Sequence, residues 1–372
     1  MRRAAVVLGM LVLGVGSALR YWYARRNGAF IAPSLPMESW DAVKDGAHNS
    51  NTDLIYWRGA FYLIHASSPW HLASKKCKLV VRRSEDARSW EKIAELNVPG
   101  EDIRDPKFAA IGDRLFLYAL KNRSLDPEPY ATVFTSSKDG SHWPAFEDMQ
   151  PGGWLFWRPK TMDGLNWYVP AYWHEHGRSA LLKSTDGEHW SIVSLIYEGE
   201  RNDETDIEFL PDGRMISTAR LEGSGSFFGS DRASTLISVS APPFESWSHT
   251  KSDVTRLDGP NLFAYGGRIY AVGRYQPSRM GPFTKLGSIF GRKRTSLFSV
   301  EEQRLVYLSD LPSSGDTSYA GVAIRGDDLY VSYYTSDIRK DPPWIMGMLV
   351  SSDIRMARVH LPSLEELATS AS

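Results

Sequence analysis

A seven-residue motif that begins with Ser and ends with Trp occurs three times in this chain. The copies are SEDARSW from Ser84, SKDGSHW from Ser137 and STDGEHW from Ser184. In each copy an Asp, followed in two of them by Gly, stands where a tight turn needs a side-chain acceptor and a permissive backbone, and the Trp adds an apolar anchor. The copies start 53 and 47 residues apart, a spacing that fits one four-stranded blade of a β-propeller.

A second repeat, two apolar strands joined by a turn with Gly or Asp, has a similar spacing. Its turns are centred on six positions: Gly59, Asp113, Gly164, Gly213, Gly267 and Asp327. They lie 54, 51, 49, 54 and 60 residues apart, and the runs CKLVVRRS, SALLKST, STLISVS, TSLFSV and MGMLVSS fall between them as outer strands. We therefore predict an all-β fold, a six-bladed β-propeller over residues 36–362. A β-sandwich or two separate β domains would not explain this spacing.

The N-terminus carries a different pattern. Two arginines precede an apolar run from Ala4 to Leu19, and the segment RYWYARR follows. We interpret residues 1–25 as a signal peptide or signal anchor, although the apolar run is short for a membrane span of about 20 residues. We expect export, to the periplasm or the cell exterior, and both cleavage and membrane anchoring through residues 4–23 remain open. Residues 26–35 then form a linker and residues 363–372 a C-terminal tail.

Composition restricts the partners. The formal net charge of -1 argues against a nucleic-acid partner. The one cysteine, Cys77, allows no internal disulfide and is expected to be a small buried side chain, so blade packing must supply the stability. We expect a monomer with no cofactor and no metal, because HEHGR at residues 174–178 lacks a third ligand at an ordinary spacing and is expected to form a solvated turn.

Polar residues open each predicted inner strand. The segments NTDL, RDPK, WRPK, DETD, DGPN and GDTSY begin at residues 51, 104, 157, 203, 258 and 315. The inner strands of a propeller converge on one axial face, so these side chains should meet at a shared pocket. Turn capping would account for a single Asp but not for polar groups in six blades. The pattern predicts a mixed-charge site for a polar ligand such as a glycan.

Several of these segments resemble a known family. The Ser-x-Asp hairpins are similar to the Asp-boxes of sialidases (neuraminidases), although each is one residue shorter than Ser-x-Asp-x-Gly-x-Thr-Trp. The stretch ETDIEFLPDGRMISTAR resembles the sialidase segment in which a Glu leads into a strand and an Arg ends the return strand, here 16 residues later. The stretch GDTSYAGVAIRGDDLYVSYY resembles the segment that carries the Tyr nucleophile. The resemblance covers all six blades and is closest to a divergent branch of sialidase-like propellers.

The resemblance implies an activity and residue roles. It implies a glycoside hydrolase that removes a terminal acidic, sialic-acid-like sugar from glycans. Tyr319 would be the nucleophile, Glu204 its partner base and Arg220 an anion-binding arginine. A second arginine would be Arg274 or Arg294, and the sequence does not choose between them.

The chain departs from the family pattern in two places that bear on the chemistry. NTDLI replaces the first Arg-Ile-Pro motif, so Arg104 or Arg158 would have to substitute for its arginine. The loop HASSPWHLASKKCK contains His65 and His71 but none of the Asp expected as acid/base. Asp53 or Asp105 could act as the acid if a crowded pocket raised its pKa. The polar positions also make three more residues candidates for substrate binding: Asp206, Asn261 and Asp316.

Two alternatives remain at this stage. The first is a glycosidase of different specificity that uses carboxylates from Asp53, Asp105, Glu204 and Asp206; an inverting enzyme would separate its acid and base by about 6.5–9.5 Å. The second is a glycan-binding propeller without catalysis. The Tyr mechanism requires Tyr319 and Glu204 to lie within hydrogen-bond reach, about 3 Å.

Overall fold

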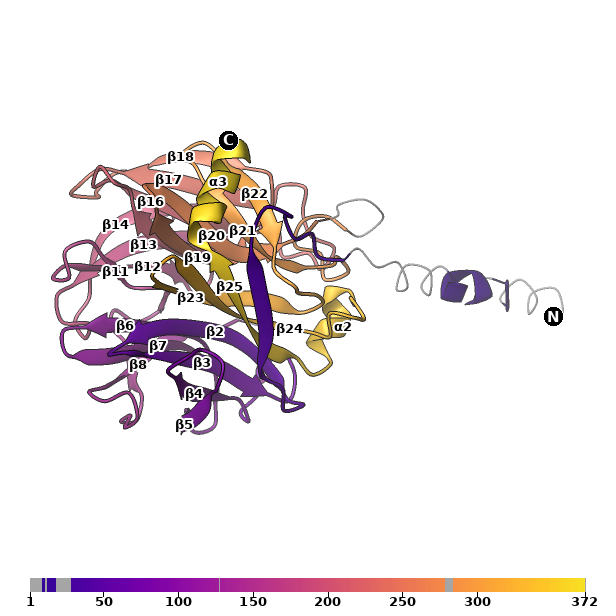
Figure 1. The fold of residues 1–372 in the computed structure, drawn as a ribbon, viewed down its shortest axis with the longest axis horizontal. Helices are drawn as coiled ribbons and strands as arrows, with labels where there is room; N and C mark the ends of the chain where they lie inside the picture. The colour runs from indigo at the N-terminus through magenta and orange to yellow at the C-terminus, as the bar shows by residue number, and fades with distance from the viewer. Residues whose placement is uncertain (1–8, 11, 18–27, 127, 278–283, 372) are drawn as a thin grey trace.

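The computed structural model describes residues 9–10, 12–17, 28–126, 128–277 and 284–371. Within this part of the chain, strands form six antiparallel sheets arranged around a central axis (Figure 1). This is the six-bladed all-β propeller that the spacing of the repeats predicts.

The first three blades follow in chain order, each starting with its innermost strand. The first contains β2 (His48–Trp57), β3 (Ala60–Ser68), β4 (Lys78–Ser84) and β5 (Glu91–Leu96). The second contains β6 (Asp102–Ile111), β7 (Arg114–Asn122), β8 (Ala131–Ser137) and β9 (Glu147–Asp148). The third contains β10 (Trp154–Phe156), β11 (Lys160–Thr161), β12 (Trp167–Trp173), β13 (Arg178–Ser184) and β14 (Ser191–Glu198).

The other three blades complete the ring. The fourth contains β15 (Asn202–Phe209), β16 (Met215–Leu221), β17 (Ser234–Ser240) and β18 (Ser248–Ser252). The fifth contains β19 (Asp258–Tyr265), β20 (Arg268–Tyr275), β21 (Arg294–Val300) and β22 (Leu305–Asp310). The sixth contains β23 (Thr317–Arg325), β24 (Asp328–Thr335), β25 (Asp353–His360) and, as its outermost strand, β1 (Met37–Val43).

The two ends of the propeller sequence share the sixth blade. β1 pairs antiparallel with β25, and Figure 1 shows this indigo strand beside the yellow C-terminal strands. Around the axis, β2 contacts β6, β15 contacts β19, β19 contacts β23, and β23 contacts β2. The pairing of β1 with β25 closes the ring of blades and supplies hydrogen-bond partners to the outer edge of β25. It also brings the first and last inner strands together.

The repeated Ser-x-Asp turns connect the third and fourth strands of the first three blades. In the turn at Ser184, the Ser184 hydroxyl and two backbone N–H groups donate to Asp186, and the Trp190 indole donates to the Gly187 carbonyl at 3.0 Å. Gly187 has φ 82°, and a Cβ there would lie 3.0 Å from the Tyr118 hydroxyl. These turns brace neighbouring blades and contribute none of the polar residues of the inner strands.

Apolar side chains fill the spaces between blades. One cluster joins the first two blades through residues such as Ile64, Leu79, Leu117 and Val133. Each fully buried side chain of this kind stabilises the fold by about 1.5–3 kcal/mol. Cys77 is buried as expected; its thiol donates to the Ile103 carbonyl, and burial raises its pKa to about 12.

Three segments differ from the sequence prediction. MGMLVSS, predicted as a strand, instead spans the end of the short helix α2 (Trp344–Met348) and the residues before β25. Most of the predicted tail lies in helix α3 (Leu361–Ala371), whose Leu364 and Ala368 are buried against the last two blades. Within the predicted linker, the Phe30 backbone exchanges two hydrogen bonds of 2.8 Å with Asp310. The pattern of apolar residues in these segments did not predict their secondary structure, because contacts with distant parts of the chain determine their conformation.

Residues 1–8, 11 and 18–27, which include most of the predicted signal peptide or anchor, lie outside the described residues. Among the helices that are described, none is long and apolar enough to span a membrane.

Candidate active site

Five of the six inner strands are bulged at the same level, where the predicted polar segments lie. The register shifts at Asn51, Asp105, Glu204, Gly259 and Tyr319. Each of these residues has a positive φ, from 22° at Glu204 to 62° at Gly259. Bulges re-aim side chains, and positive φ at non-glycine residues is uncommon and concentrates at functional sites. The repeated bulge therefore marks a ring of positions around the axis.

Glu204 and Tyr319 meet across this ring. The Tyr319 hydroxyl donates a hydrogen bond to Oε1 of Glu204, which joins the fourth and sixth blades. The other carboxylate oxygen, Oε2, accepts the backbone N–H of Gly259 at 2.8 Å. Tyr319 is 9% exposed and Glu204 is 5% exposed, so the pair lies in a largely water-excluded position. The geometric requirement of the tyrosine mechanism is met.

Arg220 completes this central group. Its Nη1 lies 2.9 Å from Oε1 of Glu204. Its Nε and Nη2 form a two-pronged ion pair with the buried carboxylate of Asp203, at 2.6 and 2.5 Å. Because a bidentate carboxylate fixes the plane of a guanidinium, Asp203 orients Arg220 toward the Glu204–Tyr319 pair.

Burial and neighbouring charges shift the pKa values of this group. Desolvation raises the pKa of Glu204 to about 7, against the lowering effect of Arg220 and with further raising by Asp203 and Asp258. Desolvation, together with the nearby Glu204 carboxyl, also raises the pKa of Tyr319 well above its usual value. Tyr319 is therefore a neutral phenol at physiological pH, and Glu204 can exchange a proton near neutrality.

The structure distinguishes the two candidates for the second arginine by position. The Arg274 guanidinium carbon lies 5.0 Å from the centre of the Tyr319 ring, and Nη2 donates to the Tyr334 hydroxyl at 2.7 Å. Arg294 is fully buried and pairs with Asp341 at 2.8 Å. Arg274 is thus the candidate placed beside Tyr319.

Arg104 and Asp105 lie on the second blade at the same level. Arg104 forms a two-pronged ion pair with Asp102, at 2.6 and 2.8 Å, and its Nη1 donates to the His71 carbonyl at 3.0 Å. Asp105 accepts a hydrogen bond from the Asn51 amide and is 7% exposed. Its carboxylate is also close enough to contribute to the raised pKa of Tyr319. Asp105 therefore faces the same part of the axis as Tyr319.

Four other predicted site residues connect neighbouring blades. Arg158 bonds to Asp53 at 3.2 Å and to the carbonyls of Pro260 and Ala320 at 2.8 and 2.7 Å. Each of the remaining three contacts the backbone of a neighbouring blade: Asp53 accepts from Phe108 N, Asp206 accepts from Leu262 N, and Asn261 donates to the Ala320 carbonyl. The side chains of these four residues hold inner strands together.

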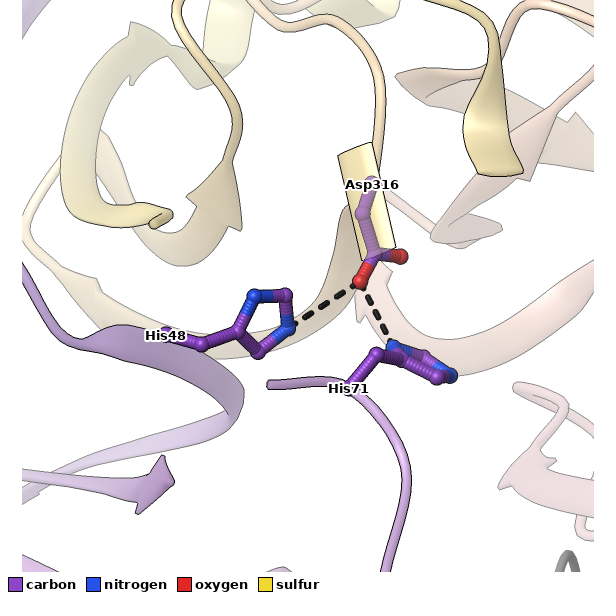
Figure 2. A group of neighbouring side chains, drawn as sticks. All are labelled: His48, His71 and Asp316. Atoms are coloured by element: carbon purple, nitrogen blue, oxygen red, sulfur yellow. Dashed lines mark hydrogen bonds and ion pairs between the residues drawn. The ribbon is translucent and has the colours of Figure 1, made fainter. Parts of the chain in front are cut away.

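Asp316 lies in a buried hydrogen-bonded cluster beside Arg274. Its Oδ1 accepts from the Trp344 indole at 2.8 Å and from the Tyr334 hydroxyl at 3.0 Å. Its Oδ2 lies 2.6 Å from His71 Nδ1 and 3.2 Å from His48 Nε2, as Figure 2 shows. Asp316 thus connects the arginine over Tyr319 with two histidines from the first blade.

Sequence reasoning missed several members of the site. Arg256 forms a two-pronged ion pair with Asp258, at 2.7 and 3.0 Å, and Trp344 stacks on Arg274 at 4.7 Å. A signal for Arg256 is present, because arginine and aspartate two residues apart in an extended segment share a face, as Asp102 and Arg104 do on β6. Trp344 had no such signal, since it comes from a short helix outside the repeat.

Among the residues that the structure describes, two clusters bring together side chains of the types that bind metals. They are His48 with His71 and Asp316, and His176 with Asp203 and Glu222. In the first, Asp316 Oδ2 already faces both imidazoles.

In the second cluster, Asp203 is paired with Arg220, and His176 faces carboxylates on both ring nitrogens. Burial alone would lower the pKa of His176, but these carboxylates raise it to about 10. The protonated imidazolium ring therefore supplies the positive charge that a metal ion would bring to this cluster. The HEHGR segment is therefore partly a buried ion-pair network, and the expectation of a solvated turn was wrong for His176.

Comparison with known proteins shows similarity only at the level of structure. No family model matches the chain, and no curated protein matches it. The structure is similar to the phage phi92 endosialidase, with TM-score 0.65 and 10% identity over 88% of this chain and 69% of that one. It is also similar to Trypanosoma rangeli sialidase, with TM-score 0.65 and 13% identity over 91% of this chain and 61% of that one.

The T. rangeli sialidase in complex with sialic acid aligns with TM-score 0.60 and 13% identity, over 92% of this chain and 61% of that one. The present chain thus spans between 61% and 69% of the length of these structures. At these identities the likeness establishes the fold. The chain has the six-bladed β-propeller fold of sialidases.

Proposed function

We propose that this protein is a glycoside hydrolase that removes a terminal acidic, sialic-acid-like sugar from glycans. The observation that carries the proposal is the hydrogen-bonded pair of Tyr319 and Glu204 on the propeller axis, with Arg220 against it. The sialidase fold supports a glycan-related function, and export predicted from residues 4–19 would place the enzyme where glycans are exposed.

A tyrosine nucleophile suits a sugar acid. A sialic acid carries a carboxylate on the carbon that is attacked, and a carboxylate nucleophile about 4 Å away would feel roughly 4 kcal/mol of repulsion at an effective dielectric near 20. The neutral phenol of Tyr319 avoids this repulsion. Sialidases are accordingly an exception to the use of two carboxylates by glycosidases.

Each residue of the group has a defined task. As the Tyr319 oxygen bonds to the anomeric carbon, its proton passes to Oε1 of Glu204, which must be ionised beforehand. Arg220 and Arg274 flank the tyrosine from two blades and would hold the substrate carboxylate. In the second step Glu204 returns the proton to the phenolate oxygen when water releases the sugar.

The test is a panel of aryl glycosides that includes a sialoside and uronides, assayed with wild type and Tyr319→Phe. Loss of the nucleophile should lower kcat by a factor on the order of 10⁴ on the true substrate. Tyr118→Phe is a matched control, because Tyr118 is also buried but donates its hydroxyl to a backbone carbonyl between the second and third blades.

Undiminished turnover by Tyr319→Phe would refute the tyrosine mechanism. Turnover of a neutral glycoside alone would favour a glycosidase of different specificity. Binding of a sugar with no turnover of any glycoside would favour the non-catalytic propeller.

A further inference from the structure

His71 lies beside Asp316, next to Arg274, and the contact with Asp316 fixes one of its ring nitrogens. It belongs to the connection between β3 and β4, where its backbone N–H donates to Met348 and its carbonyl accepts from Arg104. Its side chain is 22% exposed, whereas those of His48 and Asp316 are fully buried. His71 is therefore the member of this cluster that can reach a ligand.

The tautomer of His71 follows from its partner. Burial alone would raise the pKa of Asp316, but the facing imidazoles of His71 and His48 hold it well below its usual range. An ionised carboxylate only accepts hydrogen bonds, so Nδ1 of His71, 2.6 Å from Oδ2, must carry a proton. Nε2 is then the nitrogen that gains and loses a proton, and Figure 2 shows it on the side of the ring away from Asp316.

The same carboxylate connects His71 to the group around Tyr319. Asp316 accepts from Tyr334 and lies 3.4 Å from Arg274 Nη2, and Arg274 stacks over the Tyr319 ring. The Trp344 ring contacts both sides of this connection: it lies 6.3 Å from the His71 ring and 4.7 Å from the Arg274 guanidinium. His71 and Arg274 thus both contact Asp316 and Trp344.

The carboxyl groups that could serve as the acid are already engaged in hydrogen bonds or ion pairs within the protein. Asp53 accepts from the Phe108 backbone and from Arg158, and Asp105 accepts from Asn51. Glu204 is committed to Tyr319 and Arg220. Among the titratable groups of the described site, His71 combines partial exposure with a ring nitrogen directed away from its buried partner.

We propose that His71 is the proton donor to the leaving group, with Asp316 as the residue that positions its ring. This inference rests on the proposed glycosidase function. In the first step the bond between the anomeric carbon and the leaving oxygen breaks, Nε2–H gives its proton to that oxygen, and the Tyr319 oxygen bonds to the carbon. In the second step neutral Nε2 takes a proton from the attacking water, and Tyr319 leaves with the proton that Glu204 returns.

The charges around His71 define the pH dependence. Burial lowers its pKa, Asp316 opposes that effect, and His48 and Arg104 lower the pKa further. The protonated donor is therefore lost as pH rises through a value below 6.5, the ordinary pKa of histidine. The rate of a reaction that needs this proton should therefore fall as pH rises through the same range.

The test compares two leaving groups on one sugar. The 4-nitrophenyl sialoside releases nitrophenolate, which departs without a proton. The methyl sialoside releases methanol, whose oxygen must be protonated as it departs. His71→Gln should keep kcat/KM on the nitrophenyl substrate, which reports the first step alone, within about threefold but lower kcat/KM on the methyl substrate on the order of 10²–10⁴-fold. The alkaline limb of kcat/KM for the methyl substrate should disappear. His142→Gln, at an exposed turn in the second blade, is the control.

The outcomes separate the two proposals. Equal losses on both substrates would show that His71 only supports Arg274 or the fold, and wild-type rates on both would show that it has no role; either result overturns the inference alone. A wild-type protein that turns over neither substrate would refute the sialidase-like function and this inference with it. Thermal unfolding of His71→Gln should match wild type, and if it does not, His71→Asn provides the second variant for the same comparison.

Discussion

Replacing Glu204 with Gln should abolish activity and at the same time change how stability depends on pH. Burial raises the pKa of Glu204 from 4.5 to about 7, so the folded protein holds this proton more tightly than the unfolded chain does. A group with a raised carboxyl pKa stabilises the fold at low pH, and that stability is lost as pH rises from 4.5 through 7. Gln cannot ionise, so it retains the neutral state at every pH.

The magnitude follows from the two pKa values. Between pH 5 and pH 8.5, wild type should lose about 2.5 kcal/mol relative to Glu204→Gln, because a tenfold difference in proton affinity between the folded and unfolded states corresponds to about 1.4 kcal/mol. The Gln amide has only one oxygen, whereas Glu204 accepts from both the Gly259 N–H and Arg220 Nη1. That mismatch should cost about 1–3 kcal/mol, but by the same amount at every pH.

The assay is urea unfolding of both proteins at pH 5, 6, 7, 8 and 8.5, with exposed Glu91→Gln as the control for a general effect of removing a carboxylate. The free energy of unfolding of Glu204→Gln minus that of wild type should rise with pH up to about pH 7 and level off above it. A difference that stays constant over this range, or that falls, would refute the raised pKa. In wild type, kcat/KM on the 4-nitrophenyl sialoside, whose leaving group needs no proton from His71, should in turn increase through about pH 7, because Glu204 must be ionised to accept the Tyr319 proton.

Three further predictions concern the scaffold. His176→Gln should destabilise the protein most below pH 6.5, and the effect should disappear as pH rises through about 10, since the raised pKa of His176 stabilises the fold only while the ring is protonated; urea unfolding at several pH values tests this. Asp53→Asn leaves Arg158 buried without its counter-charge and should lower the free energy of unfolding by about 3–5 kcal/mol, whereas Asp41→Asn, at an exposed pair, should cost less than about 1 kcal/mol. Cys77 should react with a thiol reagent only after unfolding, because burial raises its pKa to about 12; rapid labelling of the native protein would contradict this.

The sequence predicted most of the fold because a propeller repeats its local chemistry. All six turn positions, from Gly59 to Asp327, join the first and second main strands of their blades. The polar segments that begin at residues 51 to 315 likewise lie at the axial level of the inner strands. Where the chain leaves the repeat, as at Trp344–Met348 and Leu361–Ala371, the same reasoning predicted a strand and a tail in place of helices.

The site was predicted less completely, since residues of similar type have different partners. Asp53 and Asp105 are both on inner strands, but Asp53 lies two residues beyond the bulge of its strand and accepts from the next blade's backbone, whereas Asp105 lies at a bulge. Arg274 and Arg294 lie on the paired strands β20 and β21, and only the folded structure places Arg274 over Tyr319. Sequence spacing carries no information on such contacts between blades.

The sequence by itself determined the blade count, the all-β class and the residue types that meet on the axis, because strand and turn signals are local and recur in every blade. The tertiary structure alone decided which of these residues pair. Tyr319 and Glu204 lie 115 residues apart and His71 and Asp316 lie 245 apart, so ring closure brings each pair together. Burial within the closed ring then raises the pKa of Glu204, and a pKa set by desolvation cannot be read from a linear chain.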